Sequence, residues 1–150
     1  MELALFCNFI VADRTAAFGQ PEIVLAVFPP PASVILPMKV GQSYADDIVL
    51  TGRSIDAIEA QRIGLVNLLS GEGQDAWEAA GAWIEKQILP KSASSLRMAN
   101  RAVRKEFFRR ITEDLPYMQE LYLKELMESY DANEGINAFL EKRKPEWKHN

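Results

Sequence analysis

The sequence predicts an α/β protein, with short mixed elements over residues 1–70 and helices over residues 71–150. Two short apolar runs, at residues 9–12 and 65–69, are typical of buried strands. Beyond residue 71, apolar residues recur at helical spacing along one face of each segment. The chain therefore combines a part that contains strands with a helical part, and its length of 150 residues fits one domain.

The first elements are punctuated by proline and glycine. Residues 3–7 fit either a helix or a strand, because the run is too short for its periodicity to decide. Residues 18–22 are turn-like, since Gly19 permits a positive φ and Pro21 fixes its own φ. The Pro29-Pro30-Pro31 triplet predicts a stiff, extended bend, followed by a helix over residues 32–40 that Pro37 kinks.

Helix signals become clearer after Gly41. A short helix is expected over residues 43–50. Ser54 is a plausible N-cap for a second helix over residues 55–63, and Gly64 stands where a C-terminal glycine belongs.

The second half contains two helical faces and two further helices. Asp114 is expected to cap a helix over residues 115–130, with Pro116 in its first turn, and a last helix should span residues 133–144. The apolar faces are made by Trp77, Ala80, Ile84 and Ile88, and by Leu96, Ala99, Val103 and Phe107.

Composition excludes several classes of protein. With 48% hydrophobic and 25% charged residues, the chain is neither extensively disordered nor collagen-like. A net charge of −4 and a pI near 5.1 argue against a nucleic-acid partner and against an anionic membrane surface. One cysteine, Cys7, and one histidine, His149, cannot form a disulfide framework or a cysteine-based zinc site, so no metal is expected.

The sequence favours a cytoplasmic location. Its longest apolar run, at residues 23–31, is far shorter than the roughly 20 residues that span a bilayer. The first residues lack the basic segment of a secretory signal. They are already apolar, without a polar lead-in, which is typical of a start within a structure.

Two glutamates have apolar sequence neighbours. Glu2 precedes four apolar residues, and Glu22 lies between Pro21 and Ile23. A carboxylate in apolar surroundings is easier to protonate, and a pair of them suits a reaction that takes one proton and gives another. The alternatives are that Glu2 is a first-turn residue favoured by the helix dipole and that Glu22 is an exposed turn residue.

Other candidates have simpler interpretations. A basic run could meet phosphates, but a solvated helix face is the commoner role. Phe139 and Lys142, one helical turn apart, could stack on a purine and pair with a phosphate, or could be a core ring beside a surface lysine. Cys7 is expected to be an inert core thiol, and Trp77 and Trp83 to serve packing. The basic run comprises Arg97, Arg101, Arg104, Lys105, Arg109 and Arg110.

Taken together and in order, four segments resemble the crotonase (enoyl-CoA hydratase/isomerase) superfamily, over residues 2–148. The joint order and spacing of the segments are specific, although no single one is diagnostic. The resemblance implies an α/β crotonase-like fold, with the C-terminal part of a ββα spiral over residues 1–70 and a helical trimerisation region over residues 71–150. The segments are Met1-Glu2-Leu3-Ala4-Leu5-Phe6-Cys7-Asn8, Ala17-Phe18-Gly19-Gln20-Pro21-Glu22, Leu50-Thr51-Gly52-Arg53-Ser54 with Ala60-Gln61-Arg62-Ile63-Gly64-Leu65-Val66-Asn67, and Glu134-Gly135-Ile136-Asn137-Ala138-Phe139-Leu140-Glu141-Lys142-Arg143.

The resemblance also implies roles for individual residues. Glu2 and Glu22 would hold a water and serve as the acid/base pair of a hydratase. Phe139 and Lys142 would reach the nucleotide of coenzyme A in a neighbouring subunit of a trimer or hexamer. No cofactor is implied beyond the coenzyme A of the substrate thioester. Family members carry roughly another hundred residues before Glu2, including both backbone donors of the oxyanion hole.

One departure from the family pattern concerns the acyl pocket. Where hydratases usually have a glycine loop after the second glutamate, this chain has the proline triplet. Prolines stiffen the loop and reshape a pocket that would include Phe28, Pro30 and Pro31. The stretch is similar to that of family members that hydrate a cyclic dienoyl thioester. The alternatives are an ordinary enoyl-CoA hydratase or isomerase, or a non-catalytic fragment without an oxyanion hole.

Overall fold

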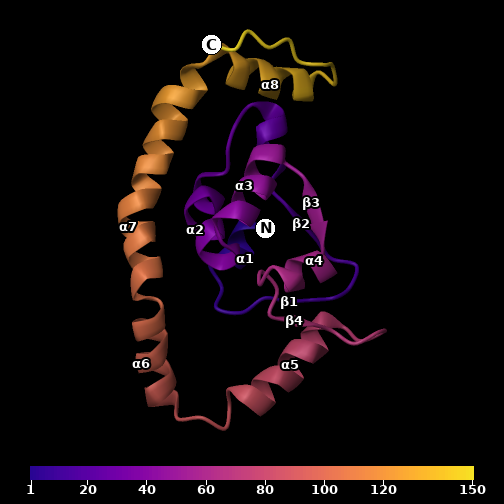
Figure 1. Cartoon of the computed structure of the whole chain (residues 1–150), viewed down its shortest axis with the longest axis vertical. Helices are drawn as coiled ribbons and strands as arrows, with labels where there is room; N and C mark the ends of the chain where they lie inside the picture. The colour runs from indigo at the N-terminus through magenta and orange to yellow at the C-terminus, as the bar shows by residue number, and fades with distance from the viewer.

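The computed structural model describes residues 1–150 and surrounds a small inner part with an arc of helices. The inner part is formed by the first seventy residues, and the helices from α5 to α8 run around it (Figure 1). The inner elements are α1 (Glu2–Leu5), β1 (Val11–Ala12), β2 (Ala17–Gly19), η1 (Pro21–Leu25), α2 (Pro30–Val40), α3 (Gln42–Thr51), β3 (Ser54–Asp56), α4 (Ala57–Arg62) and β4 (Leu68–Leu69). The arc comprises α5 (Ala76–Gln87), α6 (Ala93–Val103), α7 (Lys105–Glu120), η2 (Leu121–Glu125), η3 (Leu126–Glu128) and α8 (Tyr130–Leu140).

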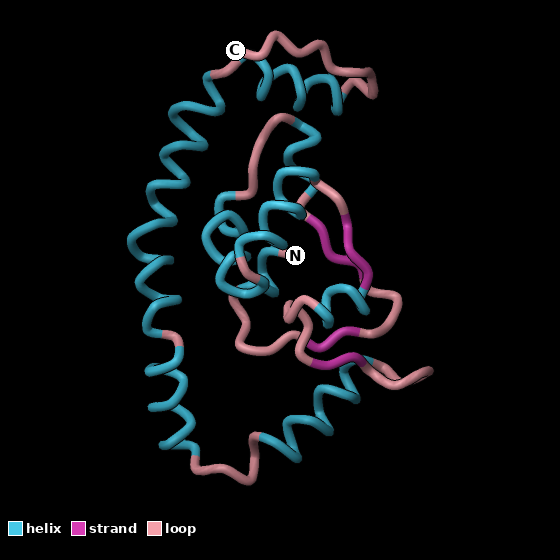
Figure 2. The backbone as a smooth tube through the Cα atoms, in the orientation of Figure 1, coloured by secondary structure: helices cyan, strands magenta, loops and turns pink.

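The strands form two separate pairs (Figure 2). β1 pairs in parallel with β4, with Val11 opposite Leu68, so both predicted strands exist but are shorter than expected. Asn67 extends this pairing by two hydrogen bonds to Ile10. Its side-chain oxygen accepts from the Ile10 backbone amide at 2.8 Å, and its backbone amide donates to the Ile10 carbonyl at 2.8 Å. β2 pairs antiparallel with β3, and Phe18 lies opposite Ile55.

The predicted cap at Ser54 is wrong. Ser54 begins β3, and Asp56 caps α4 by accepting a hydrogen bond from the Glu59 amide at 2.7 Å. Ile55 is buried between two exposed neighbours, which is the alternation of a strand with one covered face. Gly64 has a φ of +85°, as expected of the residue that follows a helix.

The proline triplet does not form one extended bend. Pro29 alone has extended backbone, with φ −85° and ψ 103°, and Pro30 and Pro31 are the first two residues of α2. The first positions of a helix need no amide hydrogen, so proline is tolerated there. Pro37 lies inside α2, which continues to Val40.

In the arc, the predicted cap at Asp114 is also wrong. Asp114 and Pro116 both lie within α7, and Ser129 caps α8 by accepting from the Ala132 amide at 3.2 Å. The helix continues through Pro116 because an apolar face packs against the core on both sides of it. That face includes Phe107, Ile111, Leu115 and Met118.

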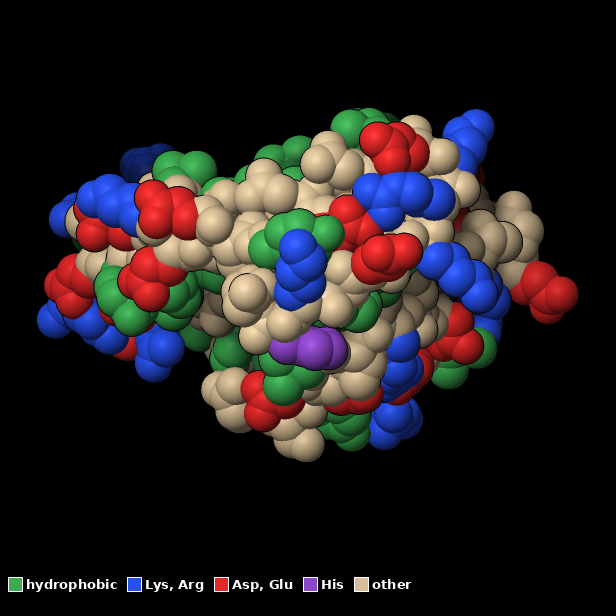
Figure 3. Space-filling view, turned by 90° about the horizontal axis from the view of Figure 1, so that it is seen from above, with side chains coloured by type: hydrophobic (Ala, Val, Ile, Leu, Met, Phe, Trp, Pro, Cys, Tyr) green, Lys and Arg blue, Asp and Glu red, His purple; other side chains and the backbone are tan.

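The core lies mostly within the inner part. Its largest fully buried hydrophobic side chains are Leu5, Ile35, Leu36, Ile48 and Leu65, and Phe107 is the one large hydrophobic side chain that the arc buries. The chain exposes 9719 Å², whereas a compact monomer of this mass exposes about 7,700 Å². Much apolar surface therefore stays open along the arc. On the face shown in Figure 3, acidic and basic side chains are interspersed. None of the helices combines the length and the apolar character needed to cross a membrane.

Candidate functional site

Glu2 lies in the first turn of α1, as its simpler interpretation expects, and also contacts a second helix. Its side chain is half-buried, and Oε1 accepts a hydrogen bond from the Ala32 amide at 3.2 Å. Ala32 is the third residue of α2, where backbone amides have no partner within the helix. The carboxylate is thus held against the N-terminal end of α2.

Glu22 lies in η1, directly after Pro21. The residue is half-buried, and its Oε2 atom is buried without a hydrogen-bond partner. Its backbone carbonyl accepts from the Val27 amide at 3.2 Å, which closes the turn through Ala26 at φ +57°. A buried carboxylate oxygen without a partner is costly unless something else binds it. This oxygen is therefore available to a ligand or a water.

The two glutamates are related to the start of α2 in different ways. Glu2 reaches it by a hydrogen bond, and η1 leads into it through the connection that ends at Pro29. No hydrogen bond joins the two carboxylates. η1 itself packs against α3 and α8, so Glu22 is positioned by both the inner part and the arc.

The predicted acyl-pocket residues belong to this start of α2. Phe28, Pro30 and Pro31 are all half-buried. The Phe28 ring meets the Tyr122 ring edge-on, with centroids 5.6 Å apart, which links the loop to η2 in the arc. The assignment of these residues to an acyl pocket stays a prediction.

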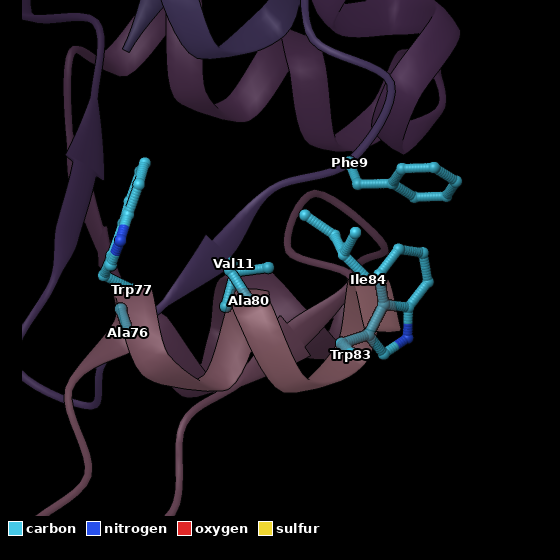
Figure 4. Close-up of a pocket in the computed structure, with 7 residues that line it drawn as sticks. All are labelled: Phe9, Val11, Ala76, Trp77, Ala80, Trp83 and Ile84. Carbon is cyan, nitrogen blue, oxygen red and sulfur yellow. The ribbon is translucent and has the colours of Figure 1, made fainter. Parts of the chain in front are cut away.

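The apolar cavities lie elsewhere. One of about 390 Å³ is lined by β1 and α5 residues (Figure 4), and one of about 500 Å³ lies between α5 and α6. Neither is lined by a titratable side chain, so neither offers acid–base chemistry. Trp83 contacts Phe9 at 4.7 Å between centroids and serves packing, but Trp77 is 85% exposed, which contradicts the packing role predicted for it.

Phe139 and Lys142 do not share a helix. α8 ends at Leu140, and Lys142 has a φ of +55° in the turn that closes the helix. The Lys142 amide donates to the Phe139 carbonyl at 3.2 Å. Phe139 is 65% exposed, so it is not the core residue of its simpler interpretation. Both side chains are accessible from outside the chain.

An ion pair with one buried partner fixes α8 beside them. Glu134 is buried, and Arg143 donates to both of its carboxylate oxygens, one of them at 2.9 Å. These hydrogen bonds, with one from the Glu146 amide at 2.9 Å, lower the pKa of Glu134 to about 2. The pair ties the residues after α8 back onto the helix.

The basic run is split between two helices and has mixed roles. Arg97 and Arg101 are exposed on α6, and Arg109 and Arg110 pair with Glu106. Arg104 is buried at the junction of α6 and α7, which the sequence did not indicate. Cys7 is exposed, so its prediction as a core thiol is wrong.

Sequence reasoning also missed Gln20. Its side chain is 2% exposed, and its Nε2 atom has no hydrogen-bond partner. Its position two residues before Glu22 is the one sequence feature that marks Gln20 as a candidate site residue. No group of three or more His, Cys, Asp or Glu side chains is arranged to hold a metal ion.

Comparisons with known proteins support the family resemblance over the whole chain. A family model described as Enoyl-CoA hydratase/isomerase matches residues 1–150. The chain is 48% identical over 149 residues to the cyclohexa-1,5-dienecarbonyl-CoA hydratase of Thauera aromatica. It is 41% identical over 149 residues to a probable enoyl-CoA hydratase of Rhizobium meliloti. In both cases, the match covers 99% of this chain and 57% of the relative.

Solved structures agree. The crystal structure of carnitinyl-CoA hydratase from Mycobacterium avium matches with a TM-score of 0.87 at 29% identity, over 99% of this chain and 57% of that one. The crystal structure of an enoyl-CoA hydratase from the same organism matches with a TM-score of 0.85 at 28% identity, over 98% and 57%. The chain thus has the C-terminal part of a crotonase-like fold, and it spans little more than half the length of these relatives. Since the family match extends from the first residue to the last, the chain belongs to the enoyl-CoA hydratase/isomerase family.

Proposed function

We propose that the protein to which this chain belongs adds water to the unsaturated bond of an acyl-CoA thioester, with Glu2 and Glu22 as the acid/base pair. The observation that carries the proposal is the unpartnered, buried Oε2 of Glu22 in η1, the element that precedes α2, together with the Glu2 carboxylate held at the start of α2. Family membership supplies the class of reaction.

The chemistry needs two carboxyl groups in opposite protonation states. One glutamate accepts a proton from water as the water oxygen bonds to the β-carbon. The other donates its proton to the α-carbon, so that water is added across the double bond without net change in charge. Backbone amides at the thioester oxygen would stabilise the enolate that forms between these events.

For the acyl group, we propose cyclohexa-1,5-diene-1-carbonyl-CoA, which would place the protein in anaerobic aromatic degradation. The 48% identity to the Thauera aromatica hydratase supports this choice. So does the entry to α2, where Pro29, Pro30 and Pro31 restrict the backbone and Phe28 contacts Tyr122. A rigid pocket suits a rigid ring better than a flexible chain.

A straight-chain enoyl-CoA hydratase or isomerase is the second candidate. The 41% identity to the Rhizobium meliloti protein favours it. A non-catalytic fragment is the third, and the apolar surface exposed on the arc favours that candidate.

The remaining parts of the proposal concern binding and assembly. Phe139 and Lys142 would contact the nucleotide of coenzyme A bound by a neighbouring subunit, in a trimer or a pair of trimers. Their exposure is compatible with this role. The reaction would need no cofactor besides the coenzyme A of the substrate, and the cytoplasmic location stays a prediction.

The test compares hydration of the cyclic dienoyl thioester with that of crotonyl-CoA, using protein expressed at the full length of its gene. Glu22→Gln should lower turnover by about 10²–10⁴-fold, because it removes a general acid/base but keeps the shape of the side chain. Binding of coenzyme A should change only a few-fold.

Glu72→Gln, which alters an exposed glutamate in the loop before α5, is the matched control and should retain full turnover. Turnover within threefold of wild type in Glu22→Gln would overturn the assignment. Faster hydration of crotonyl-CoA would transfer the substrate assignment to the second candidate. Absence of turnover in the wild-type protein on both substrates would favour the third.

A further inference from the structure

The position of Glu2 depends on a helix that cannot hold itself in place. α1 has four residues, Glu2–Leu5, which is barely one turn. An isolated helix of this length is unstable in water, and its last carbonyls have no partner within the helix. Contacts with other elements must therefore determine where α1 lies and how the Glu2 carboxylate is directed.

Two cations bind the carbonyls of the two residues that directly follow α1. An Nη atom of Arg104 donates to the Phe6 carbonyl at 2.8 Å, and the Lys39 ammonium donates to the Cys7 carbonyl at 2.8 Å. Arg104 is 8% exposed, and its Nε atom is buried without a partner. Burial lowers the pKa of Lys39, and the positive charge of Arg104 lowers it further.

An aromatic contact strengthens the same junction. The Cζ atom of Arg104 lies 3.8 Å from the centre of the Phe107 ring. The Phe6 ring meets the Phe107 ring edge-on, with centroids 6.2 Å apart. The segment after α1 therefore meets the beginning of α7 through the hydrogen bond from Arg104 to Phe6 and through the contact between the Phe6 and Phe107 rings. The cation–π contact holds the Arg104 side chain against Phe107 within the same region of the arc.

The other end of α1 is fixed by Glu2 itself, through the Ala32 amide, and Leu5 is completely buried between the two ends. α1 thus lies along α2 from Ala32 to Lys39, and the residues that follow it are hydrogen-bonded to the arc by Arg104 at Phe6 and by Asn100 at Asn8, the second at 2.6 Å. Arg104 is 98 positions from Phe6 in the chain, at the break between α6 and α7.

We propose that Arg104 is a positioning residue, which anchors the C-terminal end of α1 to the arc and thereby sets the place of the Glu2 carboxylate at the start of α2. Its effect on turnover rests on the proposed function, whereas its effect on the Glu2–Ala32 hydrogen bond does not. A misplacement of a reacting group by about 1 Å can cost about 10²-fold in rate, so a modest loss of order at α1 should be measurable.

The test uses Arg104→Met, which removes the donors and the charge but keeps a long side chain. Two quantities are measured in protein of full gene length: amide hydrogen exchange at Ala32 and the kinetic constants kcat and KM. We expect exchange at Ala32 to accelerate at least about tenfold through local opening of α1. We expect kcat to fall by about 10–100-fold, with KM within threefold.

Two further variants separate positioning from general stability. Arg104→Lys keeps one charged donor and should restore most of the protection at Ala32 and most of kcat. Arg101→Met, three residues earlier on α6 and exposed, is the matched control and should leave both unchanged. If Arg104→Met does not fold, Arg104→Lys is compared with Phe107→Leu, which keeps the hydrogen bond and removes the ring.

The proposal is overturned if Ala32 keeps its protection in folded Arg104→Met, or if all core amides lose protection equally. Glu2→Gln distinguishes this failure from failure of the proposed function. Full turnover in Glu2→Gln would remove Glu2 from the chemistry while leaving the positioning result at Ala32 intact. Loss of turnover in Glu2→Gln, with normal protection and normal kcat in Arg104→Met, would keep the function and remove the role of Arg104.

Discussion

Between residues 1 and 70 the chain completely buries several large hydrophobic side chains, among them Leu5, Ile35 and Leu65, whereas the arc buries only Phe107 among its large ones. The arc instead relies on side-chain caps and on ion pairs such as Glu134 with Arg143. Burial of apolar area is the main source of stability in folded proteins, while exposed ion pairs add little. The inner part should therefore be the stable unit, and the arc should depend on its few anchors.

The largest expected effect contrasts one leucine from each region. Leu36→Ala empties a fully buried site in α2 and should cost about 2–5 kcal/mol in the free energy of unfolding. Leu123→Ala changes a side chain that is 66% exposed in η2 and should cost no more than about 0.5 kcal/mol. Urea unfolding measures both.

Equal losses in the two variants would contradict the comparison. Such a result would show that another segment or subunit covers Leu123 in the native assembly. The large exposed area of this chain, 9719 Å², leaves room for such a contact.

A second contrast uses two glycines of the arc. A Cβ atom at Gly135 in α8 would lie 2.2 Å from the Leu25 carbonyl oxygen, which is backbone and cannot turn away. Gly135→Ala should therefore separate α8 from η1, cost about 1–3 kcal/mol, and lower turnover by displacing Glu22. Thermal unfolding and the hydratase assay measure these effects.

The matched variant is Gly81→Ala in α5, where nothing lies within 4 Å of the added atom. It should raise stability by about 0.5–1 kcal/mol, because alanine favours the helix. A stabilising Gly135→Ala would show that η1 and α8 do not pack closely, and would weaken the case that the arc positions Glu22.

Sequence signals predicted those elements whose cause is local. The apolar runs at residues 9–12 and 65–69 contain β1 and β4, and Gly64 has the expected positive φ. The errors arose where one local signal competed with tertiary contacts. Asp114 and Pro116 resemble a helix start, but packing of the α7 face on the core carries the helix through them.

Within the candidate site, the sequence supplied the two glutamates but not their supports. Nothing in the basic run distinguishes Arg104 from Arg101, because burial of Arg104 depends on Phe6, which is 98 positions away. Lys142 was placed on a helix because Phe139-x-x-Lys142 has helical spacing, and the helix ends two residues before it. Such errors concern contacts between distant segments, which periodicity cannot indicate.

The smallest expected effect concerns the ionic anchor of the arc. Hydrogen bonds from Arg143 and from the Glu146 amide lower the pKa of Glu134 from 4.5 to about 2 in the folded chain. Because the folded-state pKa is the lower one, the contribution of Glu134 to stability is present above pH 4.5 and is lost as pH falls toward 2. Glu134→Gln should therefore flatten the pH dependence of unfolding in this window and loosen the residues after α8.

Urea unfolding at several pH values, with Glu72→Gln as the exposed control, measures the slope. An unchanged slope in Glu134→Gln would mean that α8 is held by its apolar contacts alone. The arc would then be stabilised in the same way as the inner part, by burial of apolar side chains and not by ionic anchors.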